Sequence, residues 1–364
     1  MIEDIQKKTV PISSTPIDEE QTLIKTNKQI ISENNKNINI LNTISMSELL
    51  DNVYTPRTPI IDNFLYTGTY LFVGAPKVGK SFFMALLAHH VSMGTSLWNY
   101  NVHKGTVLYL ALEDSYGRLQ DRFSKMFGTD GNDNLHFSIV SKRIGDGLEE
   151  QLKNFINNYK DTRLIIIDTL QKVREISGEK FSYANDYDIV TRLKKFSDDE
   201  NVCILLVYHT RKQSSEDSFD TISGSNGLLG AADGAFILQK EKRIGNKATI
   251  DVVGRDQQDQ RFYVEFDRET LLWKLIEAET EVISSTVDPL LQSIANIVNE
   301  SCPVWEGTAT ELLNLLEIDN LQPNTLTRKL NVSVERLLNE YGIVYENFRN
   351  RNGSNIKLSI NFNT

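Results

Sequence analysis

The stretch LFVGAPKVGKS, residues 71–81, joins a buried-strand pattern to a glycine-containing loop and the start of a helix. Gly74, Gly79, Lys80 and Ser81 complete the spacing G-x-x-x-x-G-K-S. In this arrangement backbone N–H groups wrap phosphate oxygens, the lysine reaches the β- and γ-phosphates, and the serine hydroxyl faces Mg²⁺. The positive end of the helix dipole adds to the attraction. We therefore predict a site for ATP and Mg²⁺ formed by Gly74, Ala75, Pro76, Lys77, Val78, Gly79, Lys80, Ser81 and Phe82.

Strand and helix patterns alternate on both sides of this stretch, up to about residue 240. Apolar runs such as RLIIID (163–168) and VCILLVYH (202–209) indicate strands, and GLEEQLKNFINNY (147–159) has helical spacing. Continuous apolar strands interleaved with helices predict an α/β fold, with a mostly parallel sheet covered on both faces. From 234 to 276, four successive strand patterns follow one another, and we expect them to form an antiparallel extension of the same sheet.

Carboxylates follow two of the predicted strands, VLYLAL (107–112) and RLIII. Because ligands bind at the carboxyl ends of parallel strands, we expect Glu113 and Asp168 to lie beside the phosphates. Glu113 can orient and deprotonate an attacking water, and Asp168 can hold Mg²⁺ together with Ser81. The simpler alternatives are a solvated acid at 113 and a helix cap at 168. Asp114 is predicted to cap the helix that follows.

The strand at 202–209 ends in His209 and leads into a polar, glycine- and serine-rich segment at 211–227. A polar residue at this edge can sense the γ-phosphate and transmit its loss to the next loop. A patternless segment of this length is usually functional or disordered. We expect it to line a DNA channel in which Arg211 and Lys212 contact phosphates. A structural histidine and a solvated loop are the alternatives.

The composition is that of an ordinary soluble globular protein, with 40% hydrophobic and 24% charged residues among 364. Its net charge of −10 argues against bulk charge-driven adhesion to nucleic acid but leaves room for a local basic groove. The apolar runs are too short to cross a bilayer, and the N-terminus has no apolar signal region. Cys203 and Cys302 have no metal-binding or disulfide spacing. We expect a cytoplasmic protein without membrane partners.

Composition shifts divide the chain into four predicted parts. Residues 1–44 are rich in Asn, Lys, Ser and Thr and are expected to be a disordered tail. Residues 45–278 form the predicted core, which starts with a short helix near 45–53. Residues 279–288 are a plausible linker, and 289–364 form a separate domain.

The predicted C-terminal domain has the outline of a winged helix, with short helical segments followed by a hairpin around Asn352-Gly353. Basic residues outnumber acidic ones beyond residue 320. We expect the segment NVSVERLLNE (331–340) to enter a groove of DNA and the hairpin to contact its backbone. A packing or oligomerisation domain is the alternative. The candidate DNA-binding residues here are Arg328, Lys329, Arg336, Arg349 and Arg351.

The order of the motifs resembles that of the RepA-like branch of RecA-fold ATPases. The segments that carry the resemblance are GAPKVGKS, LYLALED, LIIIDTLQ, LLVYHTRK, SGSNGLLGAADGAFIL and VVGRD. Together they span about residues 55–270. That branch contains hexameric plasmid replicative helicases and ATPases of mobile elements, and it is related to DnaB-type helicases.

The resemblance implies a RecA-like P-loop core and a role for each motif. It implies nucleotide and Mg²⁺ binding by Lys80 and Ser81, a catalytic base in Glu113, metal support by Asp168 and γ-phosphate sensing by His209. It also implies that Arg255 is a finger that completes the site of a neighbouring subunit. The candidate catalytic residues are thus Glu113, Lys80, His209 and Arg255.

The function expected from this resemblance is an ATP-hydrolysing motor that acts on single-stranded DNA. It would be a homo-oligomer, expected to be a hexameric ring, and a replicative helicase of a mobile element or plasmid, with a replication initiator or primase as partner. Two alternatives remain open at this point. One is a RecA-like ATPase that loads or remodels protein on single-stranded DNA without unwinding it, and the other is a DNA-binding regulator switched by nucleotide.

Overall fold

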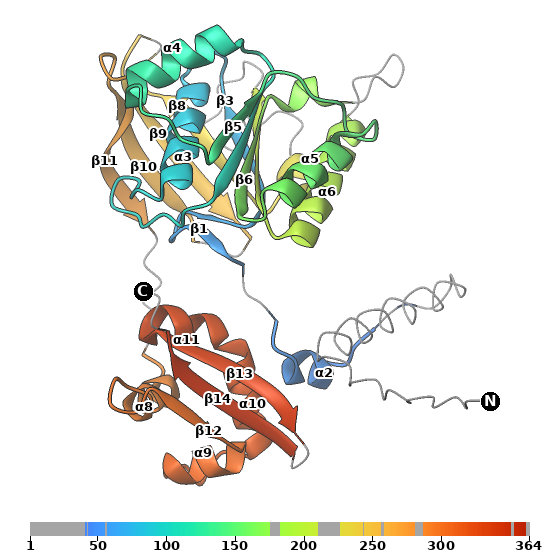
Figure 1. The fold of residues 1–364 in the computed structure, drawn as a ribbon, viewed down its shortest axis with the longest axis vertical. Coiled ribbons are helices and arrows are strands. Elements are labelled where there is room, and N and C mark those ends of the chain that lie inside the picture. Colours follow the sequence, from blue (N-terminus) through green and yellow to red (C-terminus); the bar gives the residue numbers. More distant parts are fainter. Residues whose placement is uncertain are drawn as a thin grey trace, which may run out of the picture. The chain divides into compact units, whose positions relative to one another are not determined.

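The computed structural model describes residues 41, 43–54, 57–174, 183–209, 226–242, 244–255, 258–280, 287–350 and 353–361. The chain divides into two compact units (Figure 1). The core unit is Thr55–Asp288, and the terminal unit combines Met1–Tyr54 with Pro289–Thr364. The predicted tail lies almost wholly outside the described residues. Within the described part, no helix is both long and apolar enough to cross a membrane.

The core unit is built on a nine-stranded sheet with the order β11-β10-β9-β8-β3-β7-β6-β4-β5. Its strands are β3 (Gly68–Gly74), β4 (Thr106–Ala111), β5 (Leu135–Ser138), β6 (Thr162–Asp168), β7 (Cys203–His209), β8 (Gly234–Lys240), β9 (Lys247–Gly254), β10 (Gln260–Phe266) and β11 (Trp273–Thr280). A separate two-stranded ribbon, β1 (Pro59–Ile61) and β2 (Leu65–Tyr66), precedes them. The mostly parallel α/β fold expected from the sequence is confirmed.

One strand direction differs from the expectation. The segment GAFILQ becomes β8, which pairs in parallel with β3 rather than antiparallel. The antiparallel part starts with β9 and contains β9, β10 and β11. Helix α7 (Asn226–Ala231) comes between β7 and β8. A connection that includes a helix can return the chain to the same end of the sheet, whereas a tight hairpin cannot.

Side chains alternate between the two faces of the sheet and build two apolar layers. On one face, Phe72 and Ile166 pack with helices α3 (Lys80–Met93) and α4 (Tyr116–Phe127). On the other, Val73 and Ile167 pack with α5 (Leu148–Asn158), α6 (Tyr183–Glu200) and α7. Figure 1 shows α5 and α6 side by side on their face. Both faces are therefore covered, as buried parallel strands require.

The terminal unit has its own apolar core and a three-stranded sheet with the order β12-β14-β13. Its elements are α2 (Met46–Asp51), α8 (Pro289–Ile297), β12 (Val304–Gly307), α9 (Ala309–Leu315), α10 (Pro323–Val332), α11 (Val334–Tyr341), β13 (Ile343–Asn350) and β14 (Gly353–Ile360). The expected short helices and terminal hairpin are present, and β12 adds a third strand. The residues 351–352 of the predicted turn lie outside the described part.

Two local assignments need correction. The short helix near 45–53 is α2, and it belongs to the terminal unit, so the core begins at Thr55 rather than at 45. Its sequence looks like a lead-in to the core, but its polar partners come from α10. The N-cap of α4 is Ser115, whose hydroxyl accepts from the N–H of Arg118. Asp114 lies one residue too early to cap and forms ion pairs instead.

Candidate active site

The loop between β3 and α3 is shaped by glycines that no other residue could replace without strain. Gly79 has φ +106, in the left-handed region, and it is the N-cap of α3. A Cβ atom there would lie 2.9 Å from Trp273 Cζ2, and one at Gly74 would lie 2.7 Å from the Leu238 carbonyl oxygen. Trp273 also donates from Nε1 to the Gly79 carbonyl at 3.2 Å. The strand β11 therefore supports the loop from the side, a role for Trp273 that the sequence did not reveal.

Lys80 is 4% exposed and lies inside the curve of this loop. Its Nζ donates to the carbonyls of Gly74 (2.8 Å) and Ala75 (2.9 Å) and is 2.8 Å from His209 Nδ1. Burial lowers the pKa of Lys80 to about 8, although Asp168 and Glu113 oppose this shift. Burial, and then the nearby ammonium group, also lower the pKa of His209. At neutral pH a charged lysine therefore donates to a neutral imidazole.

Ser81 and Asp168 meet at the same edge of the sheet. The hydroxyl of Ser81 donates to Asp168 Oδ2 at 2.8 Å, and the phenol of Tyr109 donates to the same oxygen at 3.1 Å. Burial raises the pKa of Tyr109 well above its ordinary value, so the phenol stays a donor. Tyr109 lies on β4, where its side chain points to the α3 face. It was not among the expected site residues, because an apolar strand pattern gives a buried tyrosine no functional signal.

Glu113 follows β4 by two residues and is exposed. The register pairs Ala111 with Asp168, so the ends of β4 and β6 lie side by side. The hydroxyl of Thr169 donates to Glu113 Oε1 at 3.3 Å, which ties the carboxylate to the residue after Asp168. The register of β3 with β7 likewise pairs Gly74 with His209. The structure thus brings together all the nucleotide-site residues expected from strand ends.

Arg122 of α4 connects two parts of this edge and was not expected from the sequence. One Nη atom lies 2.8 Å from Asp114 Oδ2, and the guanidinium carbon lies 5.3 Å from the centre of the Phe82 ring. Its other Nη atom is buried and has no hydrogen-bond partner among the described residues. Since Asp114 is next to Glu113 and Phe82 is next to Ser81, Arg122 is placed to fix both neighbours.

A matched pair of arginine variants tests this positioning role. Arg118 and Arg122 both pair with Asp114, but their side chains are 69% and 13% exposed. We expect Arg122→Ala to lower kcat about tenfold with little change in ATP affinity, since small displacements of catalytic groups are costly. Arg118→Ala is the control and should stay within about twofold, because exposed ion pairs contribute little. Equal effects of both variants on kcat would contradict a specific role of Arg122.

The remaining candidates lie away from this edge or outside the described part. Arg255 follows β9, its N–H donates to the Asp233 carbonyl at 2.9 Å, and its guanidinium donates to the Gly230 carbonyl. β9 runs antiparallel to β8, and Gly254 pairs with Gly234 at the start of β8. Arg255 is therefore at the sheet edge opposite the Gly74 loop. Arg211, Lys212 and Arg351 lie outside the described residues.

The candidate DNA-binding residues of the terminal unit divide into two groups. Arg328 forms an ion pair with Asp51, and Arg336 forms one with Glu340 one helical turn away. Lys329 and Arg349 are exposed and form no ion pair with any described residue. Arg328, Lys329 and Arg336 lie on α10 and α11, whereas Arg349 lies on β13. The structure does not gather all these cations on one helix.

The residues at the core edge fit ATP and Mg²⁺. The glycine cradle leaves no room for a Cβ atom at Gly74 or Gly79, so backbone can approach a ligand closely there. The Ser81 hydroxyl and the Asp168 carboxylate are oxygen ligands of the kind that Mg²⁺ prefers. The amide end of α3, which has no side-chain cap, suits an anion. Lys80 supplies a cation for the phosphates.

Comparisons with known proteins agree with this geometry. Residues 39–215 match the sequence model of the AAA domain family. A solved structure of an isolated ATPase domain is similar, with 16% identity and a TM-score of 0.50, and the match covers 73% of this chain and 100% of that one. A DnaB-like replicative helicase, solved in a study of its interactions with primase, gives 14% identity and a TM-score of 0.49 over 58% of each chain. A KaiC-like protein, PH0186 from Pyrococcus horikoshii, gives 13% identity and a TM-score of 0.43 over 60% of this chain and 94% of that one.

The search of curated proteins found no significant match. The AAA-domain match establishes an ATPase domain, and the similarity to the solved ATPase domain establishes its fold. The expected resemblance is thereby confirmed: the core unit of this chain is a RecA-fold P-loop ATPase of the RepA and DnaB type.

Proposed function

We propose that the protein is a DNA-dependent ATPase motor, and that it works as a ring-shaped replicative helicase of a mobile element or plasmid. The observation that carries this proposal is the convergence of Lys80, Ser81, Asp168 and Glu113 at one edge of the sheet. A nucleotide-binding regulator needs the first three, but it has no need of a fourth group placed to act on water. Glu113 therefore favours hydrolysis over a simple switch.

The chemistry that these residues can perform is phosphoryl transfer to water. Bound Mg²⁺ would supply charge neutralisation between the β- and γ-phosphates. Lys80 is already desolvated and held by two carbonyls, so it can exchange these for phosphate oxygens with little rearrangement. Glu113 is exposed and held on one side only, by Thr169, so its second oxygen is available to accept a proton from water.

His209 supports the proposal that hydrolysis is coupled to movement. Its Nδ1 atom is within hydrogen-bond distance of Lys80, and β7 ends at this residue. When phosphates draw Lys80 away, His209 loses this partner and must find another. The chain then continues into 210–225, the segment proposed to contact single-stranded DNA. A change at the γ-phosphate thus has a short covalent path to that segment.

The position of Arg255 supports a shared site between subunits. Since it lies at the edge opposite the phosphate loop, it is not placed to act on the nucleotide of its own subunit. A ring in which one subunit's phosphate edge faces the next subunit's opposite edge would bring it to a neighbour's γ-phosphate. The hexamer, the primase or initiator partner and the mobile-element context remain parts of this proposal.

Steady-state ATP hydrolysis with and without single-stranded DNA tests the proposed motor. We expect DNA to stimulate turnover at least about tenfold, since coupled motors hydrolyse slowly until the track is bound. Unwinding of a forked duplex by the same preparation then identifies a helicase. Stimulated turnover without unwinding would favour an ATPase that remodels protein on DNA, and turnover indifferent to DNA would contradict the motor.

A further inference from the structure

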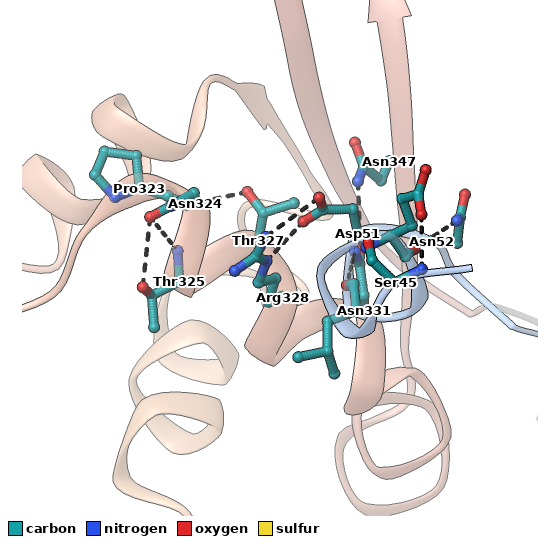
Figure 2. A network of polar contacts seen from close by, with 12 residues as sticks. Ser45, Asp51, Asn52, Pro323, Asn324, Thr325, Thr327, Arg328, Asn331 and Asn347 are labelled. Carbon is teal, nitrogen blue, oxygen red and sulfur yellow. Dashed lines mark hydrogen bonds and ion pairs between the residues drawn. The ribbon is translucent and has the colours of Figure 1, made fainter. Parts of the chain in front are cut away.

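Helix α2 packs on α10 in the terminal unit, although the two are almost 280 residues apart in sequence. Figure 2 shows the contact, in which the last turn of α2 meets Arg328 and Asn331. Arg328 donates to both carboxylate oxygens of Asp51, from Nε at 2.6 Å and from Nη2 at 3.3 Å. Its hydrogen bonds lower the pKa of Asp51, so the carboxylate is charged at neutral pH. The pairing is the fork geometry with which arginine also binds phosphate.

The second point of attachment is Asn331, which is 4% exposed. Its Oδ1 accepts from the Tyr345 hydroxyl at 2.7 Å and from Asn347 Nδ2 at 3.3 Å, so the orientation of its amide is fixed. The Nδ2 group then donates to the Leu50 carbonyl at 2.9 Å. Because Tyr345 and Asn347 lie on β13, the last turn of α2 lies where α10 meets the hairpin (Figure 2).

This junction is where a winged helix would bind DNA. Helices α9 and α10 pack together in the order of a helix-turn-helix, whose second helix enters the major groove. The expectation that 331–340, which is mostly α11, enters the groove is therefore replaced by α10. The outward side of α10 carries polar residues that can contact bases or phosphates: Asn324, Thr325, Arg328 and Lys329. Arg349 lies on the same hairpin strand as Tyr345 and Asn347.

We propose that α2 is an autoinhibitory latch, in which Asp51 occupies the phosphate-binding position of Arg328 and the helix covers the junction of α10 with the hairpin. Duplex DNA and α2 compete for this surface, so DNA binding by the terminal unit requires release of α2. The inference rests on the proposed DNA-binding function of that unit. It gives the segment before the core a role that composition did not suggest.

The contacts of α2 suit a reversible latch. The helix has six residues and buries none of them, and Asp51 is 56% exposed. Ion pairs of this exposure contribute little, so the latch depends on its high effective concentration within one chain. The helix is kept formed by a capping box, in which Ser45 accepts from the N–H of Glu48 and Glu48 accepts from the N–H of Ser45. Loss of this cap melts α2 without changing the charge at the surface.

The test compares variants of the full chain by fluorescence anisotropy with a labelled duplex DNA of mixed sequence at fixed salt. Asp51→Asn breaks the ion pair, and Ser45→Ala removes the cap. We expect each to tighten DNA binding roughly three- to tenfold, the range set by the free energy of a typical helix cap. Glu300→Gln is the matched acid-to-amide control, because Glu300 is exposed beyond α8, and it should leave affinity unchanged.

A double variant, Lys329→Ala with Arg349→Ala, separates the latch from the DNA-binding surface itself. If it weakens DNA binding while Asp51→Asn and Ser45→Ala have no effect, the surface binds DNA and the latch is refuted. If Asp51→Asn alone tightens binding, the effect is one of local charge, and the latch is again refuted. If the double variant binds as tightly as wild type, the proposed DNA-binding function of the terminal unit is wrong, and the latch falls with it.

Discussion

Replacement of Lys80 with alanine is expected to raise the Kd for ATP by about 100-fold or more, the loss of two strong charge-assisted hydrogen bonds. The structure gives this residue a single job, because its ammonium group contacts only loop carbonyls and His209 at the nucleotide edge. The loop curves around Lys80 Nζ, so a shortened side chain cannot be replaced by a neighbour. Calorimetric titration of MgATP into both proteins measures the effect.

Lys77 provides the control for charge in the same loop. It is exposed and has φ 64, and its backbone rather than its ammonium group is expected to meet phosphate. Lys77→Ala should therefore weaken ATP binding by no more than about fivefold, as expected for an exposed charge. Unfolding of Lys80→Ala is not expected, since the substitution removes a buried cation, and a thermal melt verifies this. Unchanged ATP affinity in a folded Lys80→Ala protein would rule out its role as the phosphate-binding lysine.

The nucleotide edge could be predicted from sequence because each of its elements is local. A glycine motif after an apolar strand, and acids at the ends of two other strands, specify the site once parallel strands are assumed. The direction of β8 could not be predicted in this way. Its apolar run, GAFILQ, has the same pattern in either direction, and the direction depends on the connection through α7. Four strands in succession therefore resembled a meander.

The residues that the sequence did not reveal act through partners far away in the chain. Arg122 becomes relevant only when α4 places it over Phe82, and Tyr109 only when β4 lies beside β6. Trp273 is separated from Gly79 by most of the core, yet its ring closes the space beside that glycine. The docking of α2 depends on one ion pair and one amide contact. Polar contacts of this kind leave no periodicity in a sequence.

Replacement of Glu113 with glutamine is expected to lower the turnover number for ATP by at least about 100-fold, the upper part of the range for loss of a general base. ATP affinity should stay within about threefold, because the carboxylate contacts no residue of the phosphate loop and uniform binding is retained. Glutamine keeps an oxygen that can accept from Thr169, so the side chain is expected to hold its place. Single-turnover kinetics distinguish slower chemistry from slower product release.

Asp114→Asn is the neighbouring control for this variant. Asp114 carries an equal charge but pairs with Arg118 and Arg122, so its carboxylate is committed to α4. It should lower turnover far less than Glu113→Gln, through positioning alone. Turnover of Glu113→Gln within severalfold of wild type would remove Glu113 as the base.

The same variant tests whether active sites are shared between subunits. Glu113→Gln subunits retain Arg255, and Arg255→Ala subunits retain Glu113. If the arginine acts in trans, mixed rings contain interfaces with a wild-type Glu113 on one side and a wild-type Arg255 on the other. Mixing two nearly inactive proteins should then restore part of the activity, in proportion to the fraction of such interfaces. Activity that stays at the average of the separate proteins would show that Arg255 does not complete a neighbour's site, and the position of this arginine at the far sheet edge would then exclude it from hydrolysis altogether.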